Sequence, residues 1–321
     1  MLVDAFGREV TDIRISVTKR CNFGCIYCHD EGLGPILRPR DPHEDEMTAE
    51  EIERIVRVAR EFGIRSLKFT GGEPLVRRDL EEILDRCVGH VPDVSMTTNG
   101  SMLARRAEAL RDAGLKRVNV SVDSLDPKAF KDIRKGELSP VLEGIREALR
   151  VGLKPVKLNM VVFKHTLEHI PEMIDHVGHS EGLTLQLIQF MPELVGQQEW
   201  MVDIDSVKNW LALKADREIV REMHHRRIYL FNGAEVEVVD PVYNEDFCMH
   251  CHRVRVTHDG KLKGCLNRSD DHIPVRGRTD EETREAFRTC VANRVPYYGS
   301  YVTRFPVRDA ATAPPLAGLS P

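Results

Sequence analysis

The sequence predicts an α/β fold, an incomplete (βα)6 TIM-like barrel followed by a C-terminal extension. Strand-like and helix-like segments alternate six times between residues 12 and 190, which favours a parallel sheet. Polar motifs stand at the carboxyl ends of these strands, where parallel α/β folds bind ligands. A closed barrel of this type has about eight units, so the six units here predict an incomplete one.

Each element has its own local signal. DIRISVT is apolar at every second residue, as a strand is, and the first helix opens with a capping box from Thr48 to Glu51. The third helix ends at Gly114. The predicted strands cover 12–18, 66–70, 93–99, 117–123, 156–162 and 183–190. The predicted helices cover 48–62, 78–88, 101–114, 138–151 and 168–178. Beyond them, RIYLFNGAEVEVV predicts a hairpin with an Asn-Gly turn, and residues 224–227 (HHRR) are interpreted as a solvated face.

The polar motifs follow successive strands. A cysteine-rich loop follows the first strand, TGGEP the second, TTNG the third and SVDS the fourth. Each motif alone could be an ordinary turn or helix cap. Their joint placement at the ends of neighbouring parallel strands predicts a shared binding site at the barrel mouth.

Composition limits the classes of function. The chain has 321 residues, 41% of them hydrophobic, and a net charge of -5, which disfavours nucleic-acid binding through bulk charge. No signal peptide or membrane span is visible, so we expect a cytoplasmic protein without a membrane role. In a reducing compartment its cysteines are not expected to form disulfides. Cys87 and Cys290 stand alone and are interpreted as ordinary partly buried thiols.

Six cysteines form two groups of three. The first triad is Cys21, Cys25 and Cys28, and the second triad is Cys248, Cys251 and Cys265. Both contain Cys-x2-Cys-His, the spacing of c-type haem attachment, but haem leaves Cys21 and Cys265 unexplained. A zinc site of the Cys3His type remains open for either group, and so does an iron–sulfur cluster.

The motifs also carry a resemblance. C-x3-C-x2-C with Tyr27 before its last cysteine, followed one strand later by GGEP, resembles the radical S-adenosylmethionine superfamily. Together with TGGEPLVRRD, TTNG, NVSVDSLD, VKLNMVV and FCMHCHRVRVTHDGKLKGCL, it resembles the GTP 3′,8-cyclase family of molybdenum cofactor biosynthesis, in its archaeal branch. This resemblance runs from about residue 6 to residue 275.

The resemblance implies two 4Fe–4S clusters, one on each triad, and S-adenosylmethionine as cofactor. Each cluster then keeps one iron for a reactant, S-adenosylmethionine at the first and GTP at the second. A 5′-deoxyadenosyl radical takes hydrogen from the ribose 3′ carbon of GTP, and the product is (8S)-3′,8-cyclo-7,8-dihydroguanosine 5′-triphosphate. The family also implies a reductase-, ferredoxin- or flavodoxin-like electron donor and the next enzyme of the molybdopterin pathway as partners, and a homodimer is compatible with it.

Residue roles follow from the same motifs. The implied S-adenosylmethionine contacts are Tyr27, Gly72, Ser121 and Met191. The implied GTP contacts are Arg14, Lys68, Thr97, Lys157, Arg253, Val254 and Arg255, of which Arg253 and Arg255 are expected to be catalytic. Many bacterial members have arginine where this chain has Gln186, so one phosphate contact is lost or comes from elsewhere.

The expected organisation is a radical S-adenosylmethionine barrel over residues 1–200, a cluster-binding region completing the barrel over 201–305, and a disordered tail over 306–321. One alternative is a peptide-modifying radical S-adenosylmethionine enzyme whose second cluster only transfers electrons. Another is a non-catalytic zinc-binding module. The cationic motif Arg253-x-Arg255 and Lys157 disfavour a peptide substrate, and TGGEP with the six units disfavours a zinc module.

Overall fold

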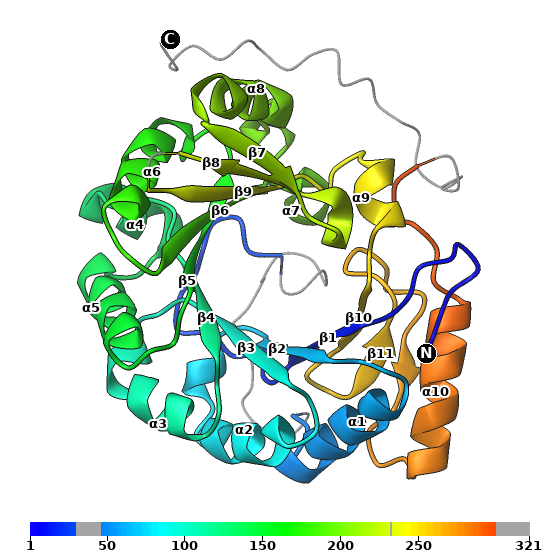
Figure 1. Cartoon of the computed structure of the whole chain (residues 1–321). Helices are drawn as coiled ribbons and strands as arrows, with labels where there is room; N and C mark the ends of the chain where they lie inside the picture. The colour runs from blue at the N-terminus through cyan, green and yellow to red at the C-terminus, as the bar shows by residue number, and fades with distance from the viewer. Residues whose placement is uncertain (30–45, 232, 300–321) are drawn as a thin grey trace.

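A twelve-stranded sheet organises the molecule, in the order β12-β11-β10-β1-β2-β3-β4-β5-β6-β9-β8-β7. The computed structural model describes residues 1–29, 46–231 and 233–299. Figure 1 shows the central strands curved into a ring with helices α1 to α6 on its outer side. The predicted alternating α/β barrel is therefore the fold of the chain.

The six predicted strands are present and pair in parallel in chain order. They are β1 (Asp12–Ser16), β2 (Ser66–Thr70), β3 (Asp93–Thr98), β4 (Arg117–Ser121), β5 (Val156–Val162) and β6 (Leu183–Gln189). The outer helices are α1 (Ala49–Glu61), α2 (Leu80–Val88), α3 (Ala107–Asp112), α4 (Pro127–Arg134), α5 (Leu138–Arg150) and α6 (Ile170–Gly178). Two predictions differ. The helix expected over 101–114 is divided into a 3-10 turn, η3 (Leu103–Arg105), and α3, and α4 was not predicted.

Opposite faces of the strands have opposite chemistry. Ile13 and Ile15 of β1 are fully buried in the core beneath the helices, whereas Arg14 between them lies on the other face. β5 repeats the pattern, with Leu158 in the core and Lys157 on the other face. Fully burying one such aliphatic side chain contributes about 1.5–3 kcal/mol, so the outer layer stabilises the fold while the inner face stays polar.

The C-terminal region adds a parallel strand at each edge of the six. β10 (Arg253–Val256) pairs in parallel with β1, and β9 (Glu235–Val239) pairs in parallel with β6. The flanking antiparallel strands are β7 (Arg217–Val220), β8 (Arg227–Leu230), β11 (Lys261–Lys263) and β12 (Ile273–Pro274). The predicted hairpin β8–β9 is confirmed, and β10 and β11 form another antiparallel pair. The remaining helices are α7 (Pro192–Val195), α8 (Ile204–Lys214), α9 (Glu245–Met249) and α10 (Asp280–Ala292).

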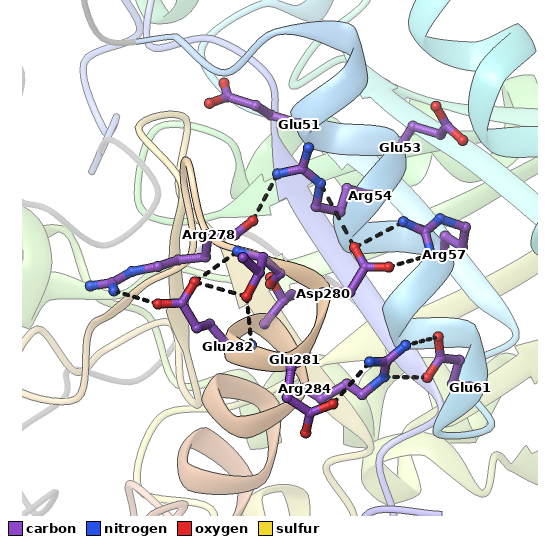
Figure 2. Close-up of polar contacts among 12 residues, drawn as sticks. Glu51, Glu53, Arg54, Arg57, Glu61, Arg278, Asp280, Glu281, Glu282 and Arg284 are labelled. Carbon is purple, nitrogen blue, oxygen red and sulfur yellow. Dashed lines mark hydrogen bonds and ion pairs between the residues drawn. The ribbon is translucent and has the colours of Figure 1, made fainter.

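Helix α10 returns to the start of the barrel and packs beside α1 (Figure 1). Figure 2 shows the ion pairs between the two helices. Arg57 donates to both carboxylate oxygens of Asp280, at 2.8 and 2.9 Å, and Arg284 holds Glu61 at 2.7 and 3.0 Å. These residues form a partly exposed α1–α10 seam, in which ion pairs contribute little individually.

Other sequence predictions concern the cysteines outside the triads and the tail. Cys87 and Cys290 are buried in the core, as expected of ordinary thiols. The tail over 306–321 lies outside the described residues. In the part of the chain that the structure describes, no helix has both the length and the apolar character needed to span a membrane.

Candidate active site at the barrel mouth

The loop that carries the first triad is held by the glycines of TGGEP. Gly72 donates its backbone N–H to the Thr18 carbonyl at 2.8 Å, and Glu73 donates to the Arg20 carbonyl at 2.7 Å. A Cβ atom at Gly72 would lie 2.2 Å from the carbonyl oxygen of Arg20. At Gly71 the backbone has a φ of 138°, which side-chain-bearing residues rarely adopt. This close approach requires glycine at both positions.

The glutamate of the same motif connects the second and third strands. Glu73 is fully buried and accepts hydrogen bonds from the Thr98 hydroxyl at 2.6 Å and the Asn99 backbone N–H at 2.5 Å. Asn99 in turn points its amide nitrogen at Cys21 Sγ, 3.9 Å away. Burial raises the pKa of Glu73, against the hydrogen bonds that lower it. TGGEP and TTNG thus form one support beneath the cysteine loop.

A buried ion pair supports the other end of that loop. Asp123, the third residue of SVDS, accepts hydrogen bonds from the Tyr27 hydroxyl at 2.5 Å, from Arg134 at 3.0 Å and from the Val161 backbone N–H at 2.8 Å. Arg134 also donates to the Tyr27 hydroxyl, and its carbonyl oxygen lies 3.8 Å from Cys25 Sγ. Asp123 and Arg134 were not predicted as site residues, although the motif SVDS contains Asp123.

The expected S-adenosylmethionine contacts divide between two places. Tyr27 and Gly72 hold the first triad's loop, as described above, and Ser121 ends β4 in register with Asn159 of β5. Met191 lies instead in a small hydrophobic cluster with Cys248. It is therefore beside the second triad rather than in the loop of the first.

Several expected GTP contacts converge on the inner face of the sheet. Arg14 is in register with Lys68 on one side and with Arg255 on the other. The Lys68 ammonium donates to Asn119 Oδ1 at 2.9 Å, and Asn119 is in register with Thr97. Six of the seven expected contacts thus lie on the neighbouring strands β10, β1, β2 and β3, and only Lys157 lies on β5.

The cations in this group are close enough to perturb one another. The pKa of Lys68 lies well below its ordinary value because of burial, reinforced by Arg14 and Arg253 and opposed by Asp12. Asp12 forms an ion pair with Arg253. Burial raises the pKa of Asp12, but Arg253 outweighs it and the net shift is downward.

Lys157 takes part in a second charged group, around Glu237 of β9. This fully buried carboxylate pairs with Lys157 and accepts a hydrogen bond from Gln186 at 2.7 Å. Arg221 and Arg226 approach its other oxygen at 3.1 and 3.2 Å. Burial raises the pKa of Glu237, but Arg226, Lys157 and Arg221 lower it to about 2. Arg221 and Arg226 therefore lie near Gln186, the position at which many bacterial members of the family have arginine.

The interpretation of residues 224–227 as a solvated face is wrong for two of them. His224 is 5% exposed and stacks on Phe247 with 4.0 Å between ring centroids. Arg226 contacts buried Glu237, as described above, and burial lowers its pKa to about 10. The sequence of residues 224–227 does not indicate this burial, because the residues that cover His224 and Arg226 belong to α9 and β9 and not to the same segment.

Two arginines from distant parts of the chain donate hydrogen bonds to the backbone of the second triad. Cys248 lies in α9, Cys251 follows that helix and Cys265 follows β11. Arg8 donates to the Cys248 carbonyl at 2.8 Å, and Arg294 donates to the Cys251 carbonyl at 2.7 Å. The first residues and the end of α10 thereby fix the backbone of the second triad.

Both arginines share one buried carboxylate. Asp4 accepts from Arg8 at 2.8 Å and lies 3.3 Å from Arg294. Burial raises the pKa of Cys251, but Arg294, Arg253 and Arg8 outweigh it, so the pKa is lowered. Asp4, Arg8 and Arg294 were not predicted as site residues, because they belong to no motif.

The segment Arg253–Val254–Arg255 alternates as β10 requires. Arg253 and Arg255 are in register with Asp12 and Arg14 on the inner face, and Val254 is fully buried in the outer core. A GTP contact at Val254 would therefore have to come from its backbone.

The donor sets fit the clusters that the motifs imply. All six triad cysteines are free thiols. Within each triad the thiols interact electrostatically, Cys25 with Cys21 and Cys28, and Cys248 with Cys251 and Cys265. Three thiolates can hold a 4Fe–4S cluster and leave one iron for a non-protein ligand.

Comparisons with known proteins decide the family. The Radical SAM superfamily model matches residues 15–177, and the Molybdenum Cofactor Synthesis C model matches residues 183–299. A probable GTP 3′,8-cyclase of Halobacterium salinarum is 51% identical over 95% of this chain and 92% of its own length. Another, from Methanocella arvoryzae, is 45% identical over 94% of this chain and 95% of its own. The chain belongs to the radical SAM superfamily and, within it, to the GTP 3′,8-cyclase family.

Solved structures of two proteins with bound S-adenosylmethionine have a similar fold. Streptococcus suis SuiB bound to S-adenosylmethionine superposes with a TM-score of 0.63, at 16% identity, over 88% of this chain and 68% of that one. Native anSMEcpe with bound AdoMet gives 0.60, at 18% identity, over 87% and 81%. The predicted family and fold class are confirmed, and membership of a family of enzymes removes the non-catalytic zinc module.

Proposed function

We propose that this protein is a GTP 3′,8-cyclase, which converts GTP into (8S)-3′,8-cyclo-7,8-dihydroguanosine 5′-triphosphate at an early step of molybdenum cofactor biosynthesis. The names of its relatives support this activity. The observation that carries the proposal is the cationic inner face of the barrel. Arg14, Lys68, Lys157, Arg253 and Arg255 lie there within a protein whose net charge is -5.

Buried cations are costly unless an anion compensates them. Two carboxylates on this face are already committed, Asp12 to Arg253 and Glu237 to Lys157. Burial is the main cause of the lowered pKa of Lys68, and Arg14 and Arg253 lower it further, while Asp12 opposes them. A polyphosphate carries the negative charge that suits this group of cations, and charge-assisted hydrogen bonds to it contribute about 1.5–3 kcal/mol each.

The first triad and its supports have a different role. A 4Fe–4S cluster bound there supplies the electron that cleaves S-adenosylmethionine to methionine and a 5′-deoxyadenosyl radical. Tyr27, held by Asp123 and Arg134, forms one wall of that site, and Gly72 lets backbone approach the cofactor without a side chain in between. Ser121 is a further proposed cofactor contact, and Met191 is proposed to reach the cofactor from the side of the second triad, where it packs with Cys248.

Arg253 and Arg255 are proposed to orient the guanine or ribose of GTP. They project from one face of β10, between the second triad and the inner face of β1. A guanidinium carries several donors in a fixed plane, so it can fix the orientation of an oxygen acceptor as well as its charge. Thr97 and the Val254 backbone are proposed as further contacts.

The second triad, Cys248, Cys251 and Cys265, is proposed to hold another 4Fe–4S cluster, which would leave one iron available to GTP. Its electrostatic contact with Arg253 supports this placement. An electron donor of the reductase, ferredoxin or flavodoxin type, the next enzyme of the molybdopterin pathway and a homodimeric assembly complete the proposal. The region over 201–305 is proposed to complete the barrel through β9 and β10.

The peptide-modifying alternative has less support. SuiB, which has been crystallised with its precursor peptide SuiA, shares 16% identity with this chain, and that likeness shows the fold alone. A peptide substrate supplies no polyphosphate for the inner cations.

The test is anaerobic incubation of protein reconstituted with iron and sulfide, together with GTP, S-adenosylmethionine and a reductant. We expect a cyclised triphosphate and 5′-deoxyadenosine in comparable amounts, and GTP binding much tighter than guanosine binding. Equal affinity for GTP and guanosine, or cofactor cleavage that never yields a cyclised nucleotide, would overturn the proposal.

A further inference from the structure

Three side chains converge beside the second triad without a role in the proposed reaction. His225 ends the 3-10 turn η6 (Met223–His225), Asp246 lies in α9, and His250 is the C-cap of α9. His225 Nδ1 lies 3.1 Å from each carboxylate oxygen of Asp246, and His250 Nδ1 lies 3.2 Å from one of them. One ligand atom from each residue falls within 4.8 Å of the other two.

The backbone is strained where it presents the first of these ligands. His224 and His225 have φ values of 63° and 46°, in the left-handed region that non-glycine residues rarely adopt. Such conformations are unfavourable for residues other than glycine and persist where surrounding contacts impose them. His224 is fixed by its stacking on Phe247 and by a 2.7 Å hydrogen bond from its N–H to the His250 carbonyl. The turn is therefore anchored so that His225 faces α9.

The two imidazoles lie next to each other, and each has Nδ1 close to the Asp246 carboxylate. Both side chains remain partly accessible, at 37% and 35%, so an ion from solvent can reach them.

Two imidazoles and one carboxylate form a donor set that suits zinc-like divalent transition metals, whereas calcium and magnesium prefer oxygen ligands alone. The geometry points to a divalent transition-metal site formed by His225, Asp246 and His250, which fastens η6 to α9. Because α9 carries Cys248 and η6 leads into Arg226, the ion would brace the second triad against the group around Glu237. The site is separate from both cysteine triads.

The chain contains a matched control. On α6, Asp175 and His179 repeat the spacing of Asp246 and His250, with His179 Nδ1 2.8 Å from the Asp175 carbonyl and 3.4 Å from its carboxylate. Within the described residues this pair has no third ligand equivalent to His225. It tests whether an exposed Asp–His pair alone binds the ion.

The experiment uses protein whose triads are already loaded with iron and sulfide, with Zn²⁺ as probe. Equilibrium dialysis and elemental analysis should find one zinc per chain beyond the iron. Zinc X-ray absorption should show nitrogen and oxygen neighbours at about 2.0–2.1 Å rather than sulfur at about 2.3 Å. His225→Ala and His250→Ala should each weaken binding at least about tenfold, while His179→Ala leaves it unchanged. Absent uptake, sulfur ligation, or equal affinity in all three variants would overturn the site.

Hydrogen exchange distinguishes zinc binding from the proposed stabilisation of the contact between η6 and α9 by the bound zinc. Zinc should slow exchange of backbone amides over 245–250 in the wild type and leave it unchanged in His225→Ala. Zinc that binds through the three residues without slowing this exchange would overturn the bracing role. These readouts do not depend on turnover, so failure of the proposed cyclase activity would leave them intact.

Discussion

The two cysteine triads are anchored alike but differ in local charge. At the first, one buried arginine, Arg134, meets one buried aspartate, Asp123. At the second, two buried arginines, Arg8 and Arg294, share the single aspartate Asp4. Buried arginine–aspartate ion pairs therefore anchor both triads, but the charges balance at the first triad and leave an excess positive charge at the second.

The pKa of one thiol in each triad reflects this difference in local charge. Burial raises the pKa of Cys25 to about 12, and Arg134 only partly opposes it because Asp123 acts in the opposite direction. At Cys251 burial also raises the pKa, yet Arg294, Arg253 and Arg8 reverse the shift. The other two thiols of the second triad, Cys248 and Cys265, keep a raised pKa because burial dominates there. Charge balance therefore distinguishes the two sites at Cys251.

The difference matches the two reactants of the proposed function. S-adenosylmethionine carries a positive sulfonium, which tolerates the carboxylates Asp123 and Glu73 near the first triad. GTP carries a triphosphate, which suits the arginines and lysines that extend from the second triad along β10, β1 and β2. The barrel thus separates a neutral-to-acidic side for a cationic cofactor from a cationic side for an anionic substrate.

Removing a first-triad cysteine should have the largest effect. Cys25→Ala should abolish formation of 5′-deoxyadenosine, because the electron for cofactor cleavage comes from this site. Bound iron should fall from roughly eight to about four per chain, as measured anaerobically. Undiminished 5′-deoxyadenosine from Cys25→Ala would contradict the division of roles.

Removing a second-triad cysteine should separate the two half-reactions. Cys265→Ala should lose the cyclised product while still cleaving some S-adenosylmethionine, since the first triad is intact. The comparison is product and 5′-deoxyadenosine from the same incubation, with Cys290→Ala, a core cysteine outside the triads, as control. Normal product from Cys265→Ala protein shown to lack its second cluster would remove that cluster from substrate binding.

Conservative changes at Arg253 and Arg255 should lower the amount of product per 5′-deoxyadenosine more than they lower the affinity for GTP. Arg253→Lys and Arg255→Lys keep the charge but lose the planar set of donors. Misplacement of a reacting group by about 1 Å can cost about 100-fold, so product per 5′-deoxyadenosine should fall by about 10–100-fold. If product instead declines only in proportion to GTP affinity, the arginines are simple charge contacts.

Lys68 should make GTP binding depend on pH. Its pKa in the free protein lies below the ordinary value, so the amine is neutral above that lowered pKa. A triphosphate favours the ammonium and raises the pKa, so binding takes up a proton. GTP affinity should therefore fall as pH rises through the range between the two pKa values, by at most about tenfold per pH unit.

Calorimetry in buffers of different ionisation enthalpy measures this proton uptake. Lys68→Arg is the matched control, because arginine stays charged throughout the range and should flatten the pH profile. An equal slope in wild type and Lys68→Arg would assign the dependence to another group.

The exposed α1–α10 seam should show the smallest effect. Arg57 and Asp280 are charged like the inner groups, but their side chains are 40% and 34% exposed. Arg57→Ala should lower the midpoint of thermal unfolding by a few degrees at most, less in high salt, and leave product per 5′-deoxyadenosine unchanged. A large loss of coupling would show that α10 transmits strain to Arg294 and the second triad.

Local patterns predicted the six barrel strands and the positions of both triads. They did not predict that β9 and β10 pair in parallel with β6 and β1, because each looks like one strand of an antiparallel hairpin with its sequence neighbour. Motifs also located Arg14 and Lys68.

The supporting charges escaped sequence analysis for a physical reason. Asp4 and Arg294 are charged residues far apart in the chain. They are buried together only because α10 returns to the first residues of the chain. A lone charged residue has no periodic signal, and its burial depends on long-range packing. The reactive positions were therefore easier to predict than the groups that hold them.

The most direct measurement uses GTP labelled with deuterium at the ribose 3′ carbon. Protein loaded with iron and sulfide is incubated anaerobically with this substrate, S-adenosylmethionine and a reductant, and 5′-deoxyadenosine is analysed by mass spectrometry. The account predicts that the deuterium appears in 5′-deoxyadenosine together with a cyclised triphosphate that has lost it. Unlabelled 5′-deoxyadenosine, with the deuterium retained in GTP, would contradict the proposal that the cationic inner face holds GTP for hydrogen abstraction at the 3′ carbon.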